Sequence, residues 1–193
     1  ITTPVLSIIT NIRLYHTQFL GKTHQKIALE KAGIIKNGVP IIIGEKDIKT
    51  ENIFKDVSRK SNAPLYFAKK TTKNFTSDLK GFYQAKNIKT VITALNQLPD
   101  FNLNNSVIKK GLSRVVENTG LKGRWQVLQN SPKVILDVGH NKEALRLIAK
   151  QINEISYNKL YLVMGFIKER EADYLLSLFP KEEIGRASCR ERV

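Results

Sequence analysis

The chain has 193 residues, 41% of them hydrophobic and 8% aromatic, which is enough to bury one large core or two small ones. It contains no apolar run near the 18 residues of a membrane-spanning helix and no pattern of an N-terminal secretory signal. We therefore expect a cytoplasmic protein without a membrane partner. The single cysteine, Cys189, excludes an internal disulfide and a zinc site built on cysteines.

The formal net charge of +15 raises nucleic acid as a partner. The composition favours another interpretation, because 23 Lys against 9 Arg, with many Asn and Ile, is typical of an AT-rich coding sequence. The lysines are scattered, and no aromatic residues alternate with them as stacking platforms for bases. We expect no nucleic-acid partner, whereas an anionic substrate or a nucleotide remains compatible with the charge.

The first part of the chain predicts a β-α-β unit. Residues 4–10 form a short apolar, β-branched run of the kind that is buried on both faces of a parallel sheet, and residues 39–43 form a second one. Between them, residues 23–32 have helical periodicity, and Gly33 stands where a C′ glycine ends a helix.

Helices and strands continue to alternate, which predicts an α/β protein with a boundary near Gly120. The expected helices lie near residues 51–61, 82–98, 106–117, 141–155 and 169–178. The expected strands lie near residues 65–68, 124–128, 133–137 and 159–164.

The last ten residues, 184–193, match one frame of a common sequencing-library adapter translated as protein. We therefore expect them to be a non-native read-through, and we exclude them from the fold prediction as one excludes a tag. Cys189 would then not be native either.

The segment Gly21-Lys22-Thr23 resembles the end of a P-loop, G-x-x-x-x-G-K-[ST]. The first glycine of that motif is replaced by His16, and without it the backbone cannot wrap a phosphate. We therefore reject a P-loop here.

Lys31 is the most informative single residue. Helical periodicity places it on one face with Leu20, Ile27 and Ala28, which is an inward-facing position for a charged side chain. Either the lysine extends its charge to solvent from the end of the helix, or it has a function there. Its spacing alone leaves both interpretations open.

Two further places carry polar residues of interest. Asp137 and His140 follow the apolar run 134–136, and ligands of open α/β sheets bind at such carboxyl ends of strands. Asp137 could equally be a turn residue, with Asn141 as a helix cap. Asn87 lies in the early turns of an expected helix, where its amide could donate to a phosphate or face water.

Four blocks of the sequence together resemble the folylpolyglutamate and dihydrofolate synthase family of Mur-type ligases, in the family's order and approximate spacing. These blocks are SIITNIRLYHTQFLGKTHQKIALEKAGIIKNGVPIIIGE, GFYQAKNIKTVITAL, GLKGRWQVL, and VILDVGHN followed by LVMGFIKERE. The resemblance implies an α/β fold with two parts. Residues 1–120 would be the C-terminal part of the Mur-ligase central ATPase domain, without its P-loop part. Residues 121–183 would begin a Rossmann-like C-terminal ligase domain.

The resemblance also implies a magnesium site. His16 matches a histidine that binds the metal ion, and Lys31 matches a catalytic lysine that is carried as its carbamate and also serves the metal. A carbamate would replace the cation by a carboxylate-like group, which explains an inward position. Tyr15 departs from the family, which usually has Asp beside the histidine.

For the nucleotide, the resemblance implies contacts from both parts of the chain. Asn87 and Arg124 match groups that hold the phosphates of ATP, and a guanidinium suits fork-like contacts with phosphate. Asp137 and His140 match ribose-side and phosphate-side contacts of the C-terminal domain.

The implied activity is that of an ATP-dependent amide ligase of folate biosynthesis, with ATP and Mg²⁺ as cofactors. It would add L-glutamate to dihydropteroate or a folylpolyglutamate through an acyl phosphate, and the enzyme would be a monomer. The 193 residues alone would be inactive, because the P-loop is absent from them. Two alternatives remain open: another Mur-type amino-acid ligase, acting on a cell-wall precursor, or a non-catalytic basic binding module.

Overall fold

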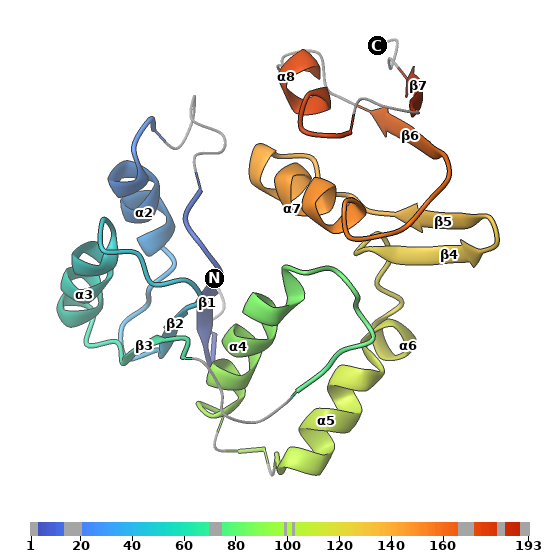
Figure 1. Ribbon diagram of the computed structural model, residues 1–193. Helices are drawn as coiled ribbons and strands as arrows, with labels where there is room; N and C mark the ends of the chain where they lie inside the picture. The colour runs from blue at the N-terminus through green and yellow to red at the C-terminus, as the bar shows by residue number, and fades with distance from the viewer. Residues whose placement is uncertain are drawn as a thin grey trace. The chain divides into compact units, whose positions relative to one another are not determined.

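The computed structural model describes residues 4–13, 21–69, 75–98, 100–101, 103–165, 172–180 and 184–189. The chain forms two compact units (Figure 1). Unit 1 contains Ile1–Asp78 and Tyr83–Thr119, and unit 2 contains Leu79–Phe82 and Gly120–Val193. The main division after Thr119 lies beside the boundary predicted near Gly120. The assignment of the two parts to an ATPase domain and a ligase domain stays a prediction.

Unit 1 is built around a parallel sheet in the order β1-β2-β3. Its strands are β1 (Ser7–Ile9), β2 (Ile41–Ile43) and β3 (Leu65–Phe67), with Ser7 opposite Ile41 and Ile41 opposite Leu65. All three isoleucines of β2 are buried, as expected for the central strand of a parallel sheet. The three predicted strands of this region are therefore confirmed, although β1 is shorter than the apolar run.

The described residues of unit 1 also form helices, which Figure 1 labels α2 to α6. They are α2 (His24–Ala32), α3 (Glu51–Lys60), α4 (Gln84–Leu95), α5 (Asn105–Ser113) and α6 (Val115–Thr119). The single helix predicted over 106–117 is wrong, because the chain breaks at Arg114 into α5 and α6. No helix of the described residues is long and apolar enough to cross a membrane.

Helix α2 begins and ends at the residues that the sequence indicates. Thr23 caps its start, since its hydroxyl accepts a hydrogen bond from the backbone N–H of Lys26 at 3.2 Å. Gly33 ends the helix, but with φ of −58° it is right-handed. The predicted end of the helix at Gly33 is therefore confirmed, and this position does not require glycine for its backbone angles.

The core of unit 1 lies between the sheet and its helices. Phe54 of α3, Ile27 of α2 and Ile41 of β2 are fully buried within it. Each such side chain stabilises the fold by about 1.5–3 kcal/mol relative to an exposed position. The sheet is thus held at a fixed position against α2 and α3.

Unit 2 has a hairpin and a second parallel strand pair. Strands β4 (Gln126–Asn130) and β5 (Lys133–Leu136) are antiparallel, and β6 (Leu160–Gly165) pairs with β7 (Ile184–Cys189) in parallel. The segment that we expect to be non-native therefore occupies the position of a strand. Its origin stays a prediction.

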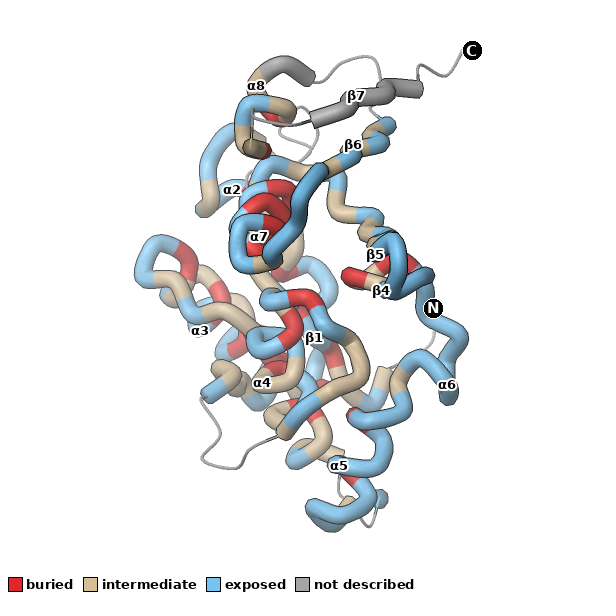
Figure 2. Tube along the Cα trace, turned by 45° about the vertical axis from the view of Figure 1, so that its right-hand side comes forward, coloured by how far each residue is buried: buried red, intermediate tan, exposed pale blue. Residues whose placement is uncertain are grey.

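Two helices of unit 2 are α7 (Lys142–Ile152) and α8 (Ala172–Leu176). Leu145 of α7 packs in the unit's core with Trp125 and Phe179. The buried residues of α7 appear red in Figure 2, and its other side is exposed. This amphipathic pattern is the one that predicted the helix.

Candidate functional site

The described residues place a cluster of polar groups at the carboxyl ends of β1 and β2, which we call the carboxyl edge. Asn11 and Arg13 follow β1, and Gly44 and Glu45 follow β2. Ligands of open parallel sheets bind outside these strand ends, where loops and helix starts converge. The carboxyl edge is therefore the first place to look for function in unit 1.

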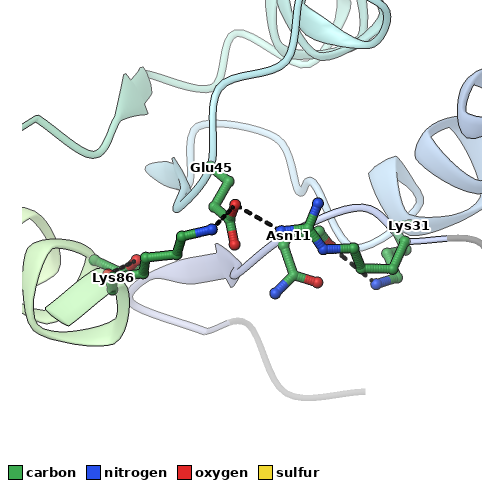
Figure 3. A network of polar contacts seen from close by, with 6 residues as sticks. Asn11, Lys31, Glu45 and Lys86 are labelled. Carbon is green, nitrogen blue, oxygen red and sulfur yellow. Dashed lines mark hydrogen bonds and ion pairs between the residues drawn. The ribbon is translucent and has the colours of Figure 1, made fainter. Parts of the chain in front are cut away.

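Lys31 reaches this edge from α2. Ile27 and Ala28 on its helix face are fully buried, whereas Lys31 is half-buried. Its Nζ donates a hydrogen bond to the backbone oxygen of Asn11 at 3.1 Å (Figure 3). Burial lowers the pKa of the Lys31 amine below its usual value. The amine thus lies against the segment that follows β1. There, solvent stabilises its positive charge less than it would at an exposed position.

At the same edge, the carboxylate of Glu45 binds two cations, the side chains of Arg13 and Lys86. Its Oε2 accepts hydrogen bonds from Nη2 of Arg13 at 2.7 Å and from Nζ of Lys86 at 2.8 Å. In Figure 3, Glu45 lies between Lys86 and Asn11. Burial would raise the pKa of Glu45, but the hydrogen bond from Lys86 and the charge of Arg13 outweigh it and lower the pKa. Glu45 therefore stays ionised at neutral pH.

Sequence reasoning missed this set of three charges. One signal could have found Glu45, since it stands two residues after the predicted strand 39–43, and Asp137 likewise lies at the end of an apolar run. The partners could not be found in this way, because they lie 32 and 41 residues away in the chain.

Helix α4 packs closely against the end of β2. A Cβ added to Gly44 would lie 2.4 Å from the backbone oxygen of Thr10 and 2.5 Å from Oγ1 of Thr90. Thr90 itself is buried. Glycine is therefore required at this position by space, and α4 is held at a fixed distance from the carboxyl edge.

Asn87 follows Lys86 in the first turn of α4. Its Nδ2 donates to Oε1 of Gln84 at 2.8 Å, and the residue is exposed. Gln84 is buried, so the amide of Asn87 is oriented by a fixed partner. The predicted phosphate contact of Asn87 stays a prediction.

In unit 2, Asp137 organises the backbone around β5. Its Oδ2 accepts from the N–H of Trp125 at 2.8 Å, and its Oδ1 accepts from the N–H of Gly139 at 2.7 Å. Trp125 is buried with a left-handed φ of 52°, a conformation that a bulky residue rarely adopts. Asp137 thus has the turn role that the sequence left open, whether or not it also contacts a nucleotide.

The other predicted residues of unit 2 lie at the start of α7 and before β4. Asn141 caps α7 through its Oδ1, which accepts from the N–H of Ala144 at 2.8 Å. His140 is exposed, with Nδ1 3.0 Å from the backbone oxygen of Val138. Arg124 is partly exposed and donates to the backbone oxygen of Gly123 at 3.4 Å.

The predicted site residues therefore fall into two groups. Lys31 and Asn87 belong to unit 1, and Arg124, Asp137 and His140 belong to unit 2. His16, the expected magnesium ligand, lies outside the described residues. Within the described residues, no group of three or more His, Cys, Asp or Glu is close enough to hold a metal ion.

The chain is similar in sequence to enzymes of folate metabolism. It is 31% identical over 181 residues to the dihydrofolate synthase/folylpolyglutamate synthase of Buchnera aphidicola subsp. Acyrthosiphon pisum, covering 86% of this chain and 43% of that protein. It is 34% identical over 170 residues to the probable dihydrofolate synthetase of Schizosaccharomyces pombe, covering 78% of this chain and 40% of that protein. The chain thus spans less than half the length of these relatives. No family model matches it.

Solved structures of the same kind of enzyme share the fold. The E. coli FolC structure in complex with ADP, without folate substrate, superposes with a TM-score of 0.78 at 22% identity, over 97% of this chain and 48% of that one. A bifunctional folylpolyglutamate synthase/dihydrofolate synthase with Mn, AMPPNP and L-glutamate bound gives 0.73 at 25% identity, over 93% and 46%. These matches confirm the predicted fold class, an α/β fold of the Mur-ligase type.

Proposed function

Because this chain belongs to the dihydrofolate synthase/folylpolyglutamate synthase family, we propose that the protein is an ATP-dependent ligase that adds L-glutamate to dihydropteroate or a folylpolyglutamate. The observation that carries the proposal is the 31% identity over 181 residues to a relative of that name. We place the enzyme in the cytoplasm, as a monomer. The alternatives, a cell-wall ligase or a basic binding module, have no comparable support.

The proposed reaction has two steps. The γ-phosphoryl group of ATP moves to a carboxylate oxygen of the folate substrate, which gives an acyl phosphate and ADP. The amine of glutamate then attacks the acyl carbon, the C–N bond forms, inorganic phosphate leaves and the amine loses a proton. Both substrates must be held together while water is excluded, since hydrolysis would consume the acyl phosphate.

For Lys31 we propose the role of a carbamate that helps to hold magnesium, with His16 as another ligand. A free lysine has a pKa of about 10.4, so few of its amines are neutral at pH 7. Burial at the carboxyl edge lowers the pKa of Lys31 and enlarges the neutral fraction that can add carbon dioxide. The carbamate oxygens would suit Mg²⁺, which prefers oxygen ligands. When bound, the metal ion offsets negative charge on the phosphates.

For the nucleotide we propose that Asn87 and Arg124 donate to the phosphates of ATP. Asp137 and His140 would contact the ribose and a phosphate. The oxygens of Asp137 accept the backbone N–H groups of Trp125 and Gly139, which holds the carboxylate in the turn after β5. The amide of Asn87 is exposed and is oriented by Gln84, as a hydrogen-bond donor to a phosphate needs to be.

The test is an assay of the full-length protein expressed from its native gene. ADP release should require both L-glutamate and a pteroate or folate substrate, and the product should carry one more glutamate by mass spectrometry. ADP release with a cell-wall precursor instead would support the other ligase. Salt-sensitive DNA binding without any ATP turnover would support the binding module.

A further inference from the structure

Glu45 stands where three segments of unit 1 meet. Its carboxylate binds Arg13, which follows β1, and Lys86, in the first turn of α4, while its own backbone continues β2. Lys31 and Asn87, the two proposed site residues of this unit that the structure describes, flank the same network. The Lys31 amine is held by Asn11, two residues before Arg13, and Asn87 follows Lys86 directly.

We propose that Glu45 is a positioning residue that sets the place of Asn87 and of the Asn11 backbone oxygen at the carboxyl edge. This inference rests on the proposed function of Lys31 and Asn87. Glu45 would touch neither substrate nor metal, and it would act through Lys86 on one side and Arg13 on the other.

The contacts of α4 explain why this carboxylate can orient a helix. Consecutive residues at the end of β2 contact α4 one turn apart, because Gly44 packs against Thr90 and Glu45 binds Lys86. The hydroxyl of Thr90 also donates to the backbone oxygen of Lys86 at 3.2 Å. Two contacts one turn apart along the axis of α4 fix both its position along that axis and its rotation about it. The rotation decides where Asn87 points.

Burial and multiplicity distinguish this network from an ordinary surface ion pair. The side chain of Glu45 is 26% exposed, against 37% for Arg13 and 51% for Lys86. Both cations bind the same oxygen, Oε2, so removing the carboxylate's charge weakens both bonds and leaves two uncompensated cations near each other. A single exposed pair would contribute little.

Glu51 offers a matched control within the same unit. It also binds two lysines, Lys46 at 3.1 Å and Lys55 at 2.5 Å, but at the start of α3. The variant Glu51→Gln removes the same charge from the same kind of network without touching α4 or the segment that follows β1.

The experiment compares Glu45→Gln, Glu51→Gln and wild type in the full-length protein. Amide hydrogen exchange is measured for a peptide that covers the first turn of α4, and KM for ATP and kcat are measured in parallel. We expect Glu45→Gln to exchange at least about fivefold faster in this peptide and to raise KM for ATP about tenfold. The melting temperature of Glu45→Gln should fall only slightly below that of wild type. Glu51→Gln should match wild type in both.

A second variant, Lys86→Met, removes the same bond from the other side and leaves Glu45 paired with Arg13. It should raise the exchange rate and KM for ATP as Glu45→Gln does, but by less. Glu45→Asp keeps the charge, so its exchange rate and KM should lie between those of Glu45→Gln and wild type. Equal exchange and equal KM in Glu45→Gln and Glu51→Gln would overturn the positioning role. If wild type has no ligase activity, the proposed function fails, and the exchange comparison alone still decides the inference about Glu45.

Discussion

The side-chain oxygen of Gln151 accepts a hydrogen bond from the backbone N–H of Phe82 at 2.8 Å, although the two residues are 69 positions apart in the chain. The Nε2 of Gln151 donates to the backbone oxygen of Lys80, also at 2.8 Å. One buried amide thus pairs with an acceptor and a donor two residues apart, as a neighbouring strand would. These bonds tie the segment Leu79–Phe82 to α7 of unit 2.

Replacing Gln151 by Met should destabilise the protein by about 2 kcal/mol, because a side chain of similar length then leaves two backbone groups without their partner. Urea unfolding of the full-length protein measures the loss. Gln129→Met is the control, since Gln129 is exposed and its side chain donates to the backbone oxygen of Ser131 in the adjacent turn. The control should change stability by less than about 0.5 kcal/mol. Equal losses would mean that the two bonds of Gln151 do not contribute.

Gly44→Ala should destabilise unit 1 by about 1–3 kcal/mol, because the new methyl group would meet the backbone oxygen of Thr10 and the hydroxyl of Thr90 at under 3 Å. Gly111→Ala should instead stabilise the protein. Gly111 lies within α5 with nothing within 4 Å of an added Cβ, and alanine favours a helix by about 0.5–1 kcal/mol over glycine. Thermal unfolding of both variants gives the comparison. A neutral Gly44→Ala would refute the close packing of α4.

Lys31→Ala should remove most of the ligase activity with little loss of stability, and Lys31→Arg should fail as well, because a guanidinium cannot carry a carbamate. Formate or acetate should restore part of the rate to the Ala variant by supplying the missing carboxylate. Product formation that depends on ATP and glutamate is the measurement.

Lys36→Ala is the control for this series. Lys36 is exposed and donates only to the backbone oxygen of Gly33 at 3.2 Å among its described contacts, so its removal should leave the rate unchanged. Near-normal turnover by Lys31→Arg would eliminate the carbamate role and leave Lys31 as an ordinary cation at a helix end.

The pH dependence of stability should report on Glu45. Its pKa is lower in the folded protein than in the unfolded chain, so its contribution is present above the unfolded value and is lost as pH falls through the folded value. The difference in unfolding free energy between wild type and Glu45→Gln should therefore be largest near neutral pH and should shrink as the solution is acidified through the folded pKa. We expect less than about 1 kcal/mol, because the group is partly exposed. A difference that grows on acidification would contradict the sign.

The sequence predicts what is local and misses what depends on tertiary pairing. A short apolar run indicated β2, because burial on both faces of a sheet requires consecutive apolar residues. The break between α5 and α6 was missed, since residues 106–117 have continuous helical periodicity and Arg114 carries no breaking signal. The partners of Glu45 were missed for another reason: their approach follows from the register of β1 on β2 and from the packing of α4.

Candidate site residues show the same limit. The position of Asp137 after a strand was correct, and its bond from the N–H of Gly139 is local. Its other bond comes from Trp125, whose left-handed conformation no sequence pattern indicates. For Lys31, periodicity predicted the inward face, and the contact with Asn11 needed the structure.

The segment Leu79–Phe82 has a practical consequence for anyone who divides this protein. The backbone passes from unit 1 to unit 2 and back before it enters unit 2 for the second time at Gly120. A gene cut after Thr119 would therefore leave four residues of unit 2 on the wrong half. The second half, expressed by itself, would lack the backbone partners of Gln151, and a synthetic peptide of the sequence Leu-Lys-Gly-Phe would be the piece to add back.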